Sequence, residues 1–173
     1  MNIRLATLED IEPIMNLVRE IVPVMRASGN FQWDDVYPNA GVFKKDVELK
    51  QLWVADIESE IGGFSAITTD QEAEYANVGW DINEPAIVTH RLAVSIHHRR
   101  QGIGKALMRQ AEIVALTKGI NILRIDTNSN NKATRLLFPK LGYEYAGETG
   151  LYFRPNLRFY CYEKILGAGP VAE

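Results

Sequence analysis

Residues 92–108 read LAVSIHHRRQGIGKALM and carry the clearest structural signal in the chain. A β-rich run, residues 86–94, leads into two glycines, Gly102 and Gly104, and an apolar periodicity that predicts a helix follows them. A helix N-terminus presents unpaired N–H groups and a partial positive charge, which suit an anionic phosphate. Glycine lets the backbone approach such a ligand closely, and the arginines before it add charge-assisted bonds. The stretch therefore predicts a phosphate-binding loop between a strand and a helix.

Two common phosphate-binding schemes do not fit this loop. The dinucleotide fingerprint needs a third glycine where Leu107 stands. The nucleoside-triphosphate loop needs Ser or Thr after its Gly-Lys pair, and Ala106 follows Lys105 here. A nucleotide-phosphate binder or kinase is therefore a weaker interpretation of the stretch.

The same stretch resembles the central acetyl-CoA motif of the GNAT N-acetyltransferases, in which a strand precedes Arg/Gln-x-x-Gly-x-Gly/Ala at the start of a helix. Residues 131–143, NKATRLLFPKLGY, resemble the family's asparagine-led helix that ends in Lys-Leu-Gly-aromatic. The resemblance runs from the first strand to Lys164 and is weakest between Gly29 and Pro85. It implies an acetyl-CoA-dependent N-acyltransferase with the GNAT fold. That fold is α/β, with a mixed central sheet of about six to seven strands, about four flanking helices and a splayed parallel strand pair.

The periodicity along the chain predicts an α/β order that agrees with this fold. We expect strands at 2–6, 52–57, 62–68, 86–94, 122–127, 143–147 and 157–164, and helices at about 8–27, 42–49, 102–118 and 131–141. Residues 1–165 are expected to form a single acetyltransferase domain. Residues 166–173 are expected to be a flexible tail, because they are small and rich in helix and strand breakers.

Composition and charge indicate the class of protein, the partners to expect and the cellular compartment. The 173 residues are 46% hydrophobic and 24% charged with a net charge of −3, as in an ordinary soluble globular protein. Basic residues are scattered, so a nucleic-acid partner is not expected. No apolar run approaches the roughly 20 residues of a membrane span. The single cysteine, Cys161, fits a reducing compartment, so we expect a cytoplasmic location.

The resemblance assigns residues to acetyl-CoA. Pantetheine is expected along the backbone of the strand that contains Leu92, and pyrophosphate at the amides from Arg100 to Lys105, while Asn131 would contact the pantetheine arm or the acyl region. The expected cofactor-binding residues are Leu92, Ala93, Val94, Arg99, Arg100, Gln101, Gly102, Ile103, Gly104, Lys105 and Asn131. Backbone N–H groups near Leu92 would polarise the thioester carbonyl. No metal is expected, because the three histidines lack ligand spacing.

The implied reaction is direct attack of a primary amine on the thioester, which benefits from a base and an acid. His90 is the candidate base, since its ordinary pKa near 6.5 suits proton acceptance around neutrality. The alternative is a histidine that only packs within its strand. The family often supplies the acid as a tyrosine at the position of Phe138, and phenylalanine cannot donate a proton. This substitution also keeps open a non-catalytic acetyl-CoA sensor or interaction module.

Residues 29–38, GNFQWDDVYP, form an irregular aromatic segment that in the family borders the acceptor site. Phe31, Trp33, Asp34 and Tyr37 are the candidate substrate-binding residues, because aromatics shape pockets and carboxylates attract cationic amines. The alternative is that Trp33 and Tyr37 fix the loop onto the core. The acceptor is expected to be a small-molecule or peptide amine, with a small molecule favoured. The sequence does not decide between a monomer and a homodimer.

Overall fold

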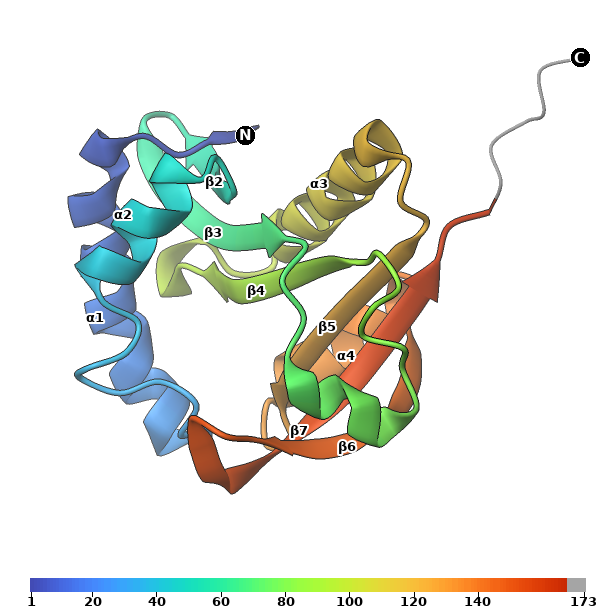
Figure 1. Cartoon of the computed structure of the whole chain (residues 1–173). Helices are drawn as coiled ribbons and strands as arrows, with labels where there is room; N and C mark the ends of the chain where they lie inside the picture. Colours follow the sequence, from blue (N-terminus) through green and yellow to red (C-terminus); the bar gives the residue numbers. More distant parts are fainter. Residues whose placement is uncertain (168–173) are drawn as a thin grey trace, which may run out of the picture. The chain divides into compact units, whose positions relative to one another are not determined.

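The computed structural model describes residues 1–167 and has the expected order of elements (Figure 1). In chain order these are β1 (Asn2–Leu5), η1 (Leu8–Asp10), α1 (Ile11–Ala27), α2 (Ala40–Glu48), β2 (Leu52–Ile57), β3 (Glu60–Thr68), η2 (Ala73–Val78), β4 (Ile87–Val94), η3 (Ile96–His98), α3 (Ile103–Lys118), β5 (Ile122–Asn128), α4 (Lys132–Lys140), β6 (Glu144–Leu151) and β7 (Arg154–Ile165). The predicted tail largely lies outside the described residues.

The strands form a mixed sheet, which confirms the predicted fold class. Their hydrogen-bonded order is β1-β2-β3-β4-β5-β7-β6. The β1–β2 and β2–β3 pairs are antiparallel, as are β5–β7 and β6–β7. Strands β4 and β5 are parallel, with Ile87 opposite Leu123 and Val88 opposite Arg124. A parallel pair needs a crossover connection, and α3 supplies it here.

The contacts group the chain into two compact units. The first contains Met1–Thr68 and Thr89–Gln110, and the second contains Thr69–Val88 together with the described residues from Ala111 onward. The boundary at Val88 falls within β4, so most of that strand belongs to the first unit. That residues 1–165 form a single domain stays a prediction.

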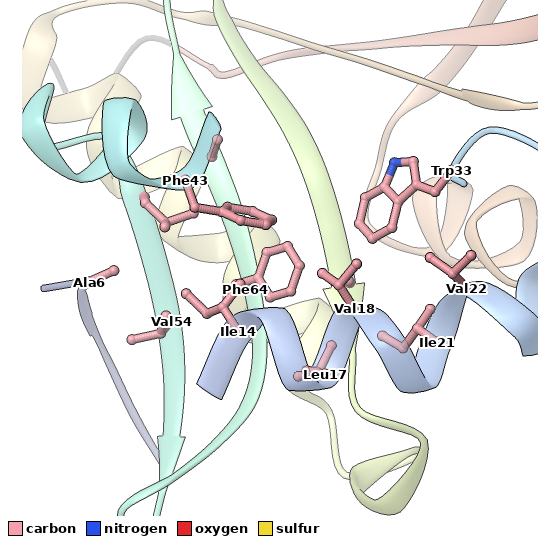
Figure 2. Close-up of a cluster of buried hydrophobic side chains, with 13 residues drawn as sticks. Ala6, Ile14, Leu17, Val18, Ile21, Val22, Trp33, Phe43, Val54 and Phe64 are labelled. Carbon is pink, nitrogen blue, oxygen red and sulfur yellow. The ribbon is translucent and has the colours of Figure 1, made fainter. Parts of the chain in front are cut away.

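The core of the first unit lies between α1 and strands β2 and β3. Five α1 side chains, Ile14, Leu17, Val18, Ile21 and Val22, are buried at helical spacing. Figure 2 shows this row facing Val54 and Phe64, with Phe43 of α2 and Trp33 beside them. Phe43 meets the Phe64 ring edge-on at 5.1 Å between centroids. This packing supports the strand that precedes the glycine loop.

The second unit has its own aromatic core. Tyr75 of η2 and the nearby Trp80 pack with Val88, Phe159 and Cys161. Trp80 also lies under the guanidinium of Arg124, 4.8 Å from the ring centroid. The long excursion between β3 and β4 is therefore a packed cover over strands β5 and β7.

A tight hairpin joins β2 to β3. Glu58 and Ser59 both have positive φ, +52° and +72°. Two such central residues give a turn whose twist matches that of paired strands. Strand β3 begins at Glu60, two residues earlier than the sequence predicted, because the turn is so short.

Candidate active site

The glycine loop lies between β4 and α3, as the sequence predicted. Ser95 starts the connection, with its N–H donated to the Gly62 carbonyl at 2.8 Å. Arg100 and Gly102 then have left-handed backbones, with φ of +63° and +79°. The first helical bond of α3 runs from the Ala106 N–H to the Gly102 carbonyl at 2.9 Å. The amides before Ala106 therefore form the open N-terminus of a 16-residue helix.

The surroundings of this loop fit an anionic ligand. A Cβ built on Gly102 would meet no atom within 4 Å, so the space beside its backbone is open. Arg99, Arg100 and Lys105 are all exposed. In contrast, Ile103 is buried and anchors the start of the helix. The loop thus combines open backbone N–H groups, a helix dipole and three exposed cations, which are features that favour an anionic ligand. That these residues bind the phosphates of acetyl-CoA stays a prediction.

Two histidines of η3, directly before the loop, lie near carboxylates of other segments. His97 Nε2 lies 3.1 Å from the Glu20 carboxylate of α1, and His98 Nε2 lies 3.8 Å from that of Glu60. A third constraint comes from Gly63 of β3. A Cβ there would lie 2.7 Å from the Ala93 carbonyl oxygen and 2.7 Å from the Ile103 side chain. Glycine at this position lets β3 approach the strand that leads into the loop.

Strand β4 places the remaining predicted residues of the first unit. Leu92 and Val94 are half-buried and pack against the cluster of Ala55, Ile103 and Leu107, whereas Ala93 is buried in the α1 core. His90 is half-buried within the strand.

Between His90 and Leu92, Arg91 has a left-handed backbone with φ of +53°. A left-handed residue at this position interrupts the regular alternation of side-chain direction between His90 and Leu92. The role of His90 as a base stays a prediction.

The Arg91 side chain is held by two segments of the first unit. Its guanidinium binds the Asp46 carboxylate of α2 at 2.7 Å and donates to the Tyr37 hydroxyl at 3.2 Å. Burial acts to lower the pKa of Arg91, but Tyr37 and Asp46 outweigh it and raise that pKa. The guanidinium therefore stays charged. The sequence did not reveal these bonds of Arg91, because nothing in the local pattern pairs it with residues 45 and 54 positions away.

The aromatic segment, which we call the aromatic loop (residues 30–38), is fixed by its own bonds. The Asp34 Oδ1 atom accepts the N–H groups of Val36 and Tyr37, each at 2.9 Å. Trp33 is only 3% exposed and stacks on Phe64 at 6.2 Å. Phe31 stays 46% exposed, with Arg26 4.9 Å from its ring centroid.

Trp33 and Tyr37 thus fix the aromatic loop to the core, and Phe31 is the aromatic side chain that it presents to solvent. The contribution of all four predicted residues to acceptor binding stays a prediction.

Asn131 lies in the second unit, whereas the glycine loop and β4 segment lie in the first. Its side-chain oxygen accepts the Thr134 N–H at 3.3 Å and so caps α4. Phe138, at the family's usual tyrosine position, is 1% exposed and packs against Tyr143 and Tyr162. The phenylalanine side chain is therefore part of an aromatic core.

The second unit also contains a buried polar pair that the sequence did not reveal. The Tyr75 hydroxyl donates to the Asp126 carboxylate at 2.5 Å, across 51 positions of sequence. Burial, followed by the Asp126 charge, raises the pKa of Tyr75 well above its ordinary value. The same two causes raise the pKa of Cys161 to about 12, so the thiol stays protonated near neutrality. Cys161 is a free cysteine and is buried.

Residues 1–167 contain no cluster of three or more His, Cys, Asp or Glu side chains arranged to hold a metal ion. Within the same residues, no helix combines the length and apolar character that crossing a membrane requires.

Comparisons with known proteins agree with this geometry. The sequence profile of the acetyltransferase (GNAT) domain matches residues 48–145, more than half of the chain. The chain is 27% identical to the uncharacterized N-acetyltransferase YesJ of Bacillus subtilis over 156 residues, which cover 82% of this chain and 81% of YesJ. It is 26% identical over 107 residues to N-acetyltransferase family 8 member 3 of Rattus norvegicus, covering 62% of this chain but only 44% of that longer protein.

Solved structures give the same result. A GNAT-family acetyltransferase from Streptococcus agalactiae superimposes with a TM-score of 0.77 at 26% identity, over 96% of each chain. The structure of yncA from Salmonella typhimurium, solved with its cofactor acetyl-CoA, has a TM-score of 0.71 at 17% identity, over 100% of this chain and 98% of that one. The second likeness concerns the fold alone. With its profile match, its relatives and its glycine loop, this chain belongs to the GNAT acetyltransferase family and is an acetyl-CoA-dependent acyltransferase.

Proposed function

We propose that this protein transfers the acetyl group of acetyl-CoA to a primary amine, and that the amine attacks the thioester directly. The observation that carries the proposal is the glycine loop. Left-handed backbones at Arg100 and Gly102 lead into the open N-terminus of α3, and three exposed cations lie close to it in the sequence. This arrangement suits the pyrophosphate of coenzyme A, because helix N-terminal amides and neighbouring cations both favour phosphate charge.

The loop and β4 would hold the cofactor between them. In this proposal the amides from Arg100 to Lys105 bind pyrophosphate, and Arg99 adds charge. The backbone of Leu92 and Val94 pairs with pantetheine, and Asn131 contacts the pantetheine arm or the acyl region. The structure of yncA with its cofactor acetyl-CoA supports acetyl-CoA as the co-substrate, since that protein shares the fold. Acetyl-CoA supplies the activated thioester, and no metal takes part.

Residues of β4 would then carry the chemistry. Backbone N–H groups near Leu92 polarise the thioester carbonyl, which favours attack by the amine nitrogen. His90 accepts the proton that the amine loses as the carbon–nitrogen bond forms and the carbon–sulfur bond breaks. Phe138 has no proton to give, so the leaving thiolate takes its proton from water. A thiol pKa near 8.5 makes that departure accessible without a dedicated acid.

The acceptor is proposed to be a small-molecule amine, bound beside the aromatic loop. Phe31 is exposed enough to contact it, Trp33 and Tyr37 set the shape of the loop, and Asp34 adds negative charge. We further propose a cytoplasmic protein in which residues 1–165 act as a single domain, with neither nucleic acid nor a membrane as partner.

A thiol-release assay tests the proposal. The purified protein is incubated with acetyl-CoA and a panel of primary amines, and free coenzyme A is measured alongside the mass of the acetylated amine. We expect release that depends on both the protein and an amine, with a gain of one acetyl group on the product. Release at the same rate without any amine would contradict transfer and indicate hydrolysis.

A further inference from the structure

Arg91 joins three segments of the first unit. Its Nε and Nη2 atoms bind the two oxygens of Asp46 at 2.7 to 3.0 Å, while Nη1 donates to the Tyr37 hydroxyl at 3.2 Å. Gln51 donates its side-chain N–H to the same carboxylate at 2.9 Å. The Asp46 and Arg91 side chains are 4% and 15% exposed. A forked, desolvated pair of this kind is a fixed junction, unlike a surface ion pair whose side chains move freely.

The junction coincides with a special backbone conformation. A φ of +53° at Arg91 is unfavourable for any residue with a Cβ, so contacts around it must keep it there. The contact to Asp46 ties the side chain to α2 and opposes relaxation of the strand to regular β geometry. A left-handed residue within a strand changes the direction of the groups on either side, as a bulge does. Those groups are His90 and the backbone N–H groups near Leu92.

The bond from Arg91 to Tyr37 extends the junction to the aromatic loop. Tyr37 contacts the Arg91 guanidinium through its hydroxyl, and its backbone carbonyl accepts the Asp34 N–H at 2.9 Å. Asp34 in turn accepts the Tyr37 N–H through its side chain. The loop is therefore a stiff turn whose end is held by Arg91, so a displacement of Arg91 would reach both the loop and β4.

We propose that Asp46, Arg91 and Tyr37 are positioning residues for acetyl transfer, which hold the left-handed backbone of β4 and the aromatic loop to one guanidinium. This inference rests on the proposed function, and it adds residues that act through His90, the β4 amides and the acceptor side of the site. Misplacement of reacting groups by about 1 Å costs on the order of 100-fold in rate, which sets the size of the expected effect.

Three variants test the proposal in the amine-dependent thiol-release assay. Arg91→Ala removes the junction and relaxes the backbone, so kcat/KM should fall roughly 100-fold, with losses in both kcat and acceptor KM. Arg91→Gly also removes the junction but accepts positive φ, so it should retain more activity than Arg91→Ala. Tyr37→Phe removes only the loop contact and should raise acceptor KM more than it lowers kcat.

Arg4→Ala is the matched control. Arg4 also bridges two carboxylates of the first unit, Asp10 at 2.7 Å and Asp56 at 3.1 Å, but it contacts neither His90 nor the aromatic loop. Its loss should lower the melting temperature while transfer, assayed well below that temperature, proceeds as in the wild type. Equal loss of transfer in Arg4→Ala and Arg91→Ala would overturn the proposal, as would wild-type kcat/KM in Arg91→Ala.

Hydrogen exchange separates this inference from the proposed function. Peptides that cover residues 30–38 and 89–94 should exchange faster in Arg91→Ala, and the loop peptide should exchange faster in Tyr37→Phe, with Arg4→Ala unchanged at both. If the wild type acetylates no amine, the proposed function fails, and this readout alone decides whether the junction exists. Unchanged exchange in Arg91→Ala would overturn the junction whatever the activity.

Discussion

Replacement of Gly102 by glutamate should weaken the binding of coenzyme A to the glycine loop. The side chain would enter open space, because a Cβ there meets nothing within 4 Å, so bulk alone has little effect on the fold. A φ of +79° makes any side chain costly at this position, by about 1 kcal/mol of folding free energy. A carboxylate about 6 Å from a phosphate charge, at an effective dielectric constant near 20, adds about 3 kcal/mol of repulsion. Binding should weaken roughly 100-fold.

Gly102→Gln is the matched control for this variant. It has the same length and the same backbone strain but no charge, so the difference between the two dissociation constants isolates the electrostatic part. Calorimetric titration with coenzyme A at two salt concentrations measures both. The difference should shrink at the higher ionic strength, because salt screens exposed charges. If the Gly102→Glu and Gly102→Gln variants bind coenzyme A with equal affinity, or if both bind it as the wild type does, the loop does not hold the phosphates and the reasoning is refuted.

Three further outcomes are expected. His90→Gln should lower kcat and flatten its dependence on pH around neutrality, while calorimetry finds an unchanged acetyl-CoA affinity; an unaltered pH profile would show that His90 is structural. Trp33→Ala should lower the free energy of unfolding by about 3–5 kcal/mol, measured by urea denaturation, because the indole stacks on Phe64 in the core. Arg4 lowers the pKa of Asp10, so stability from this pair is present above the ordinary carboxyl pKa and is lost as pH falls through the lower folded value. Asp10→Asn should therefore flatten the acid limb of stability against pH below about 4, and an acid limb as steep as in the wild type would contradict this.

The sequence predicted the elements whose signals are local. The helix after Gly102 follows from apolar spacing and a glycine at each end, and α3 ends at Lys118 before Gly119 as expected. Likewise, β-rich runs predicted strands at 52–57 and 62–68, where β2 and β3 lie.

The groups that the sequence did not predict depend on distant partners. Arg91 reads as an ordinary strand residue, and only its bonds to Asp46 and Tyr37 account for a left-handed backbone that arginine rarely adopts. The Tyr75–Asp126 hydrogen bond joins η2 to β5, and local periodicity does not show that these two elements meet. In each case tertiary packing decides the role of the side chain.

Calorimetric titration of the protein with acetyl-CoA tests the central claim most directly. We expect a single binding event that competes with coenzyme A and weakens as salt increases, because exposed arginine and lysine side chains at the glycine loop would share the phosphate charge. The absence of binding at millimolar acetyl-CoA, from a sample that unfolds cooperatively and is therefore folded, would contradict the account.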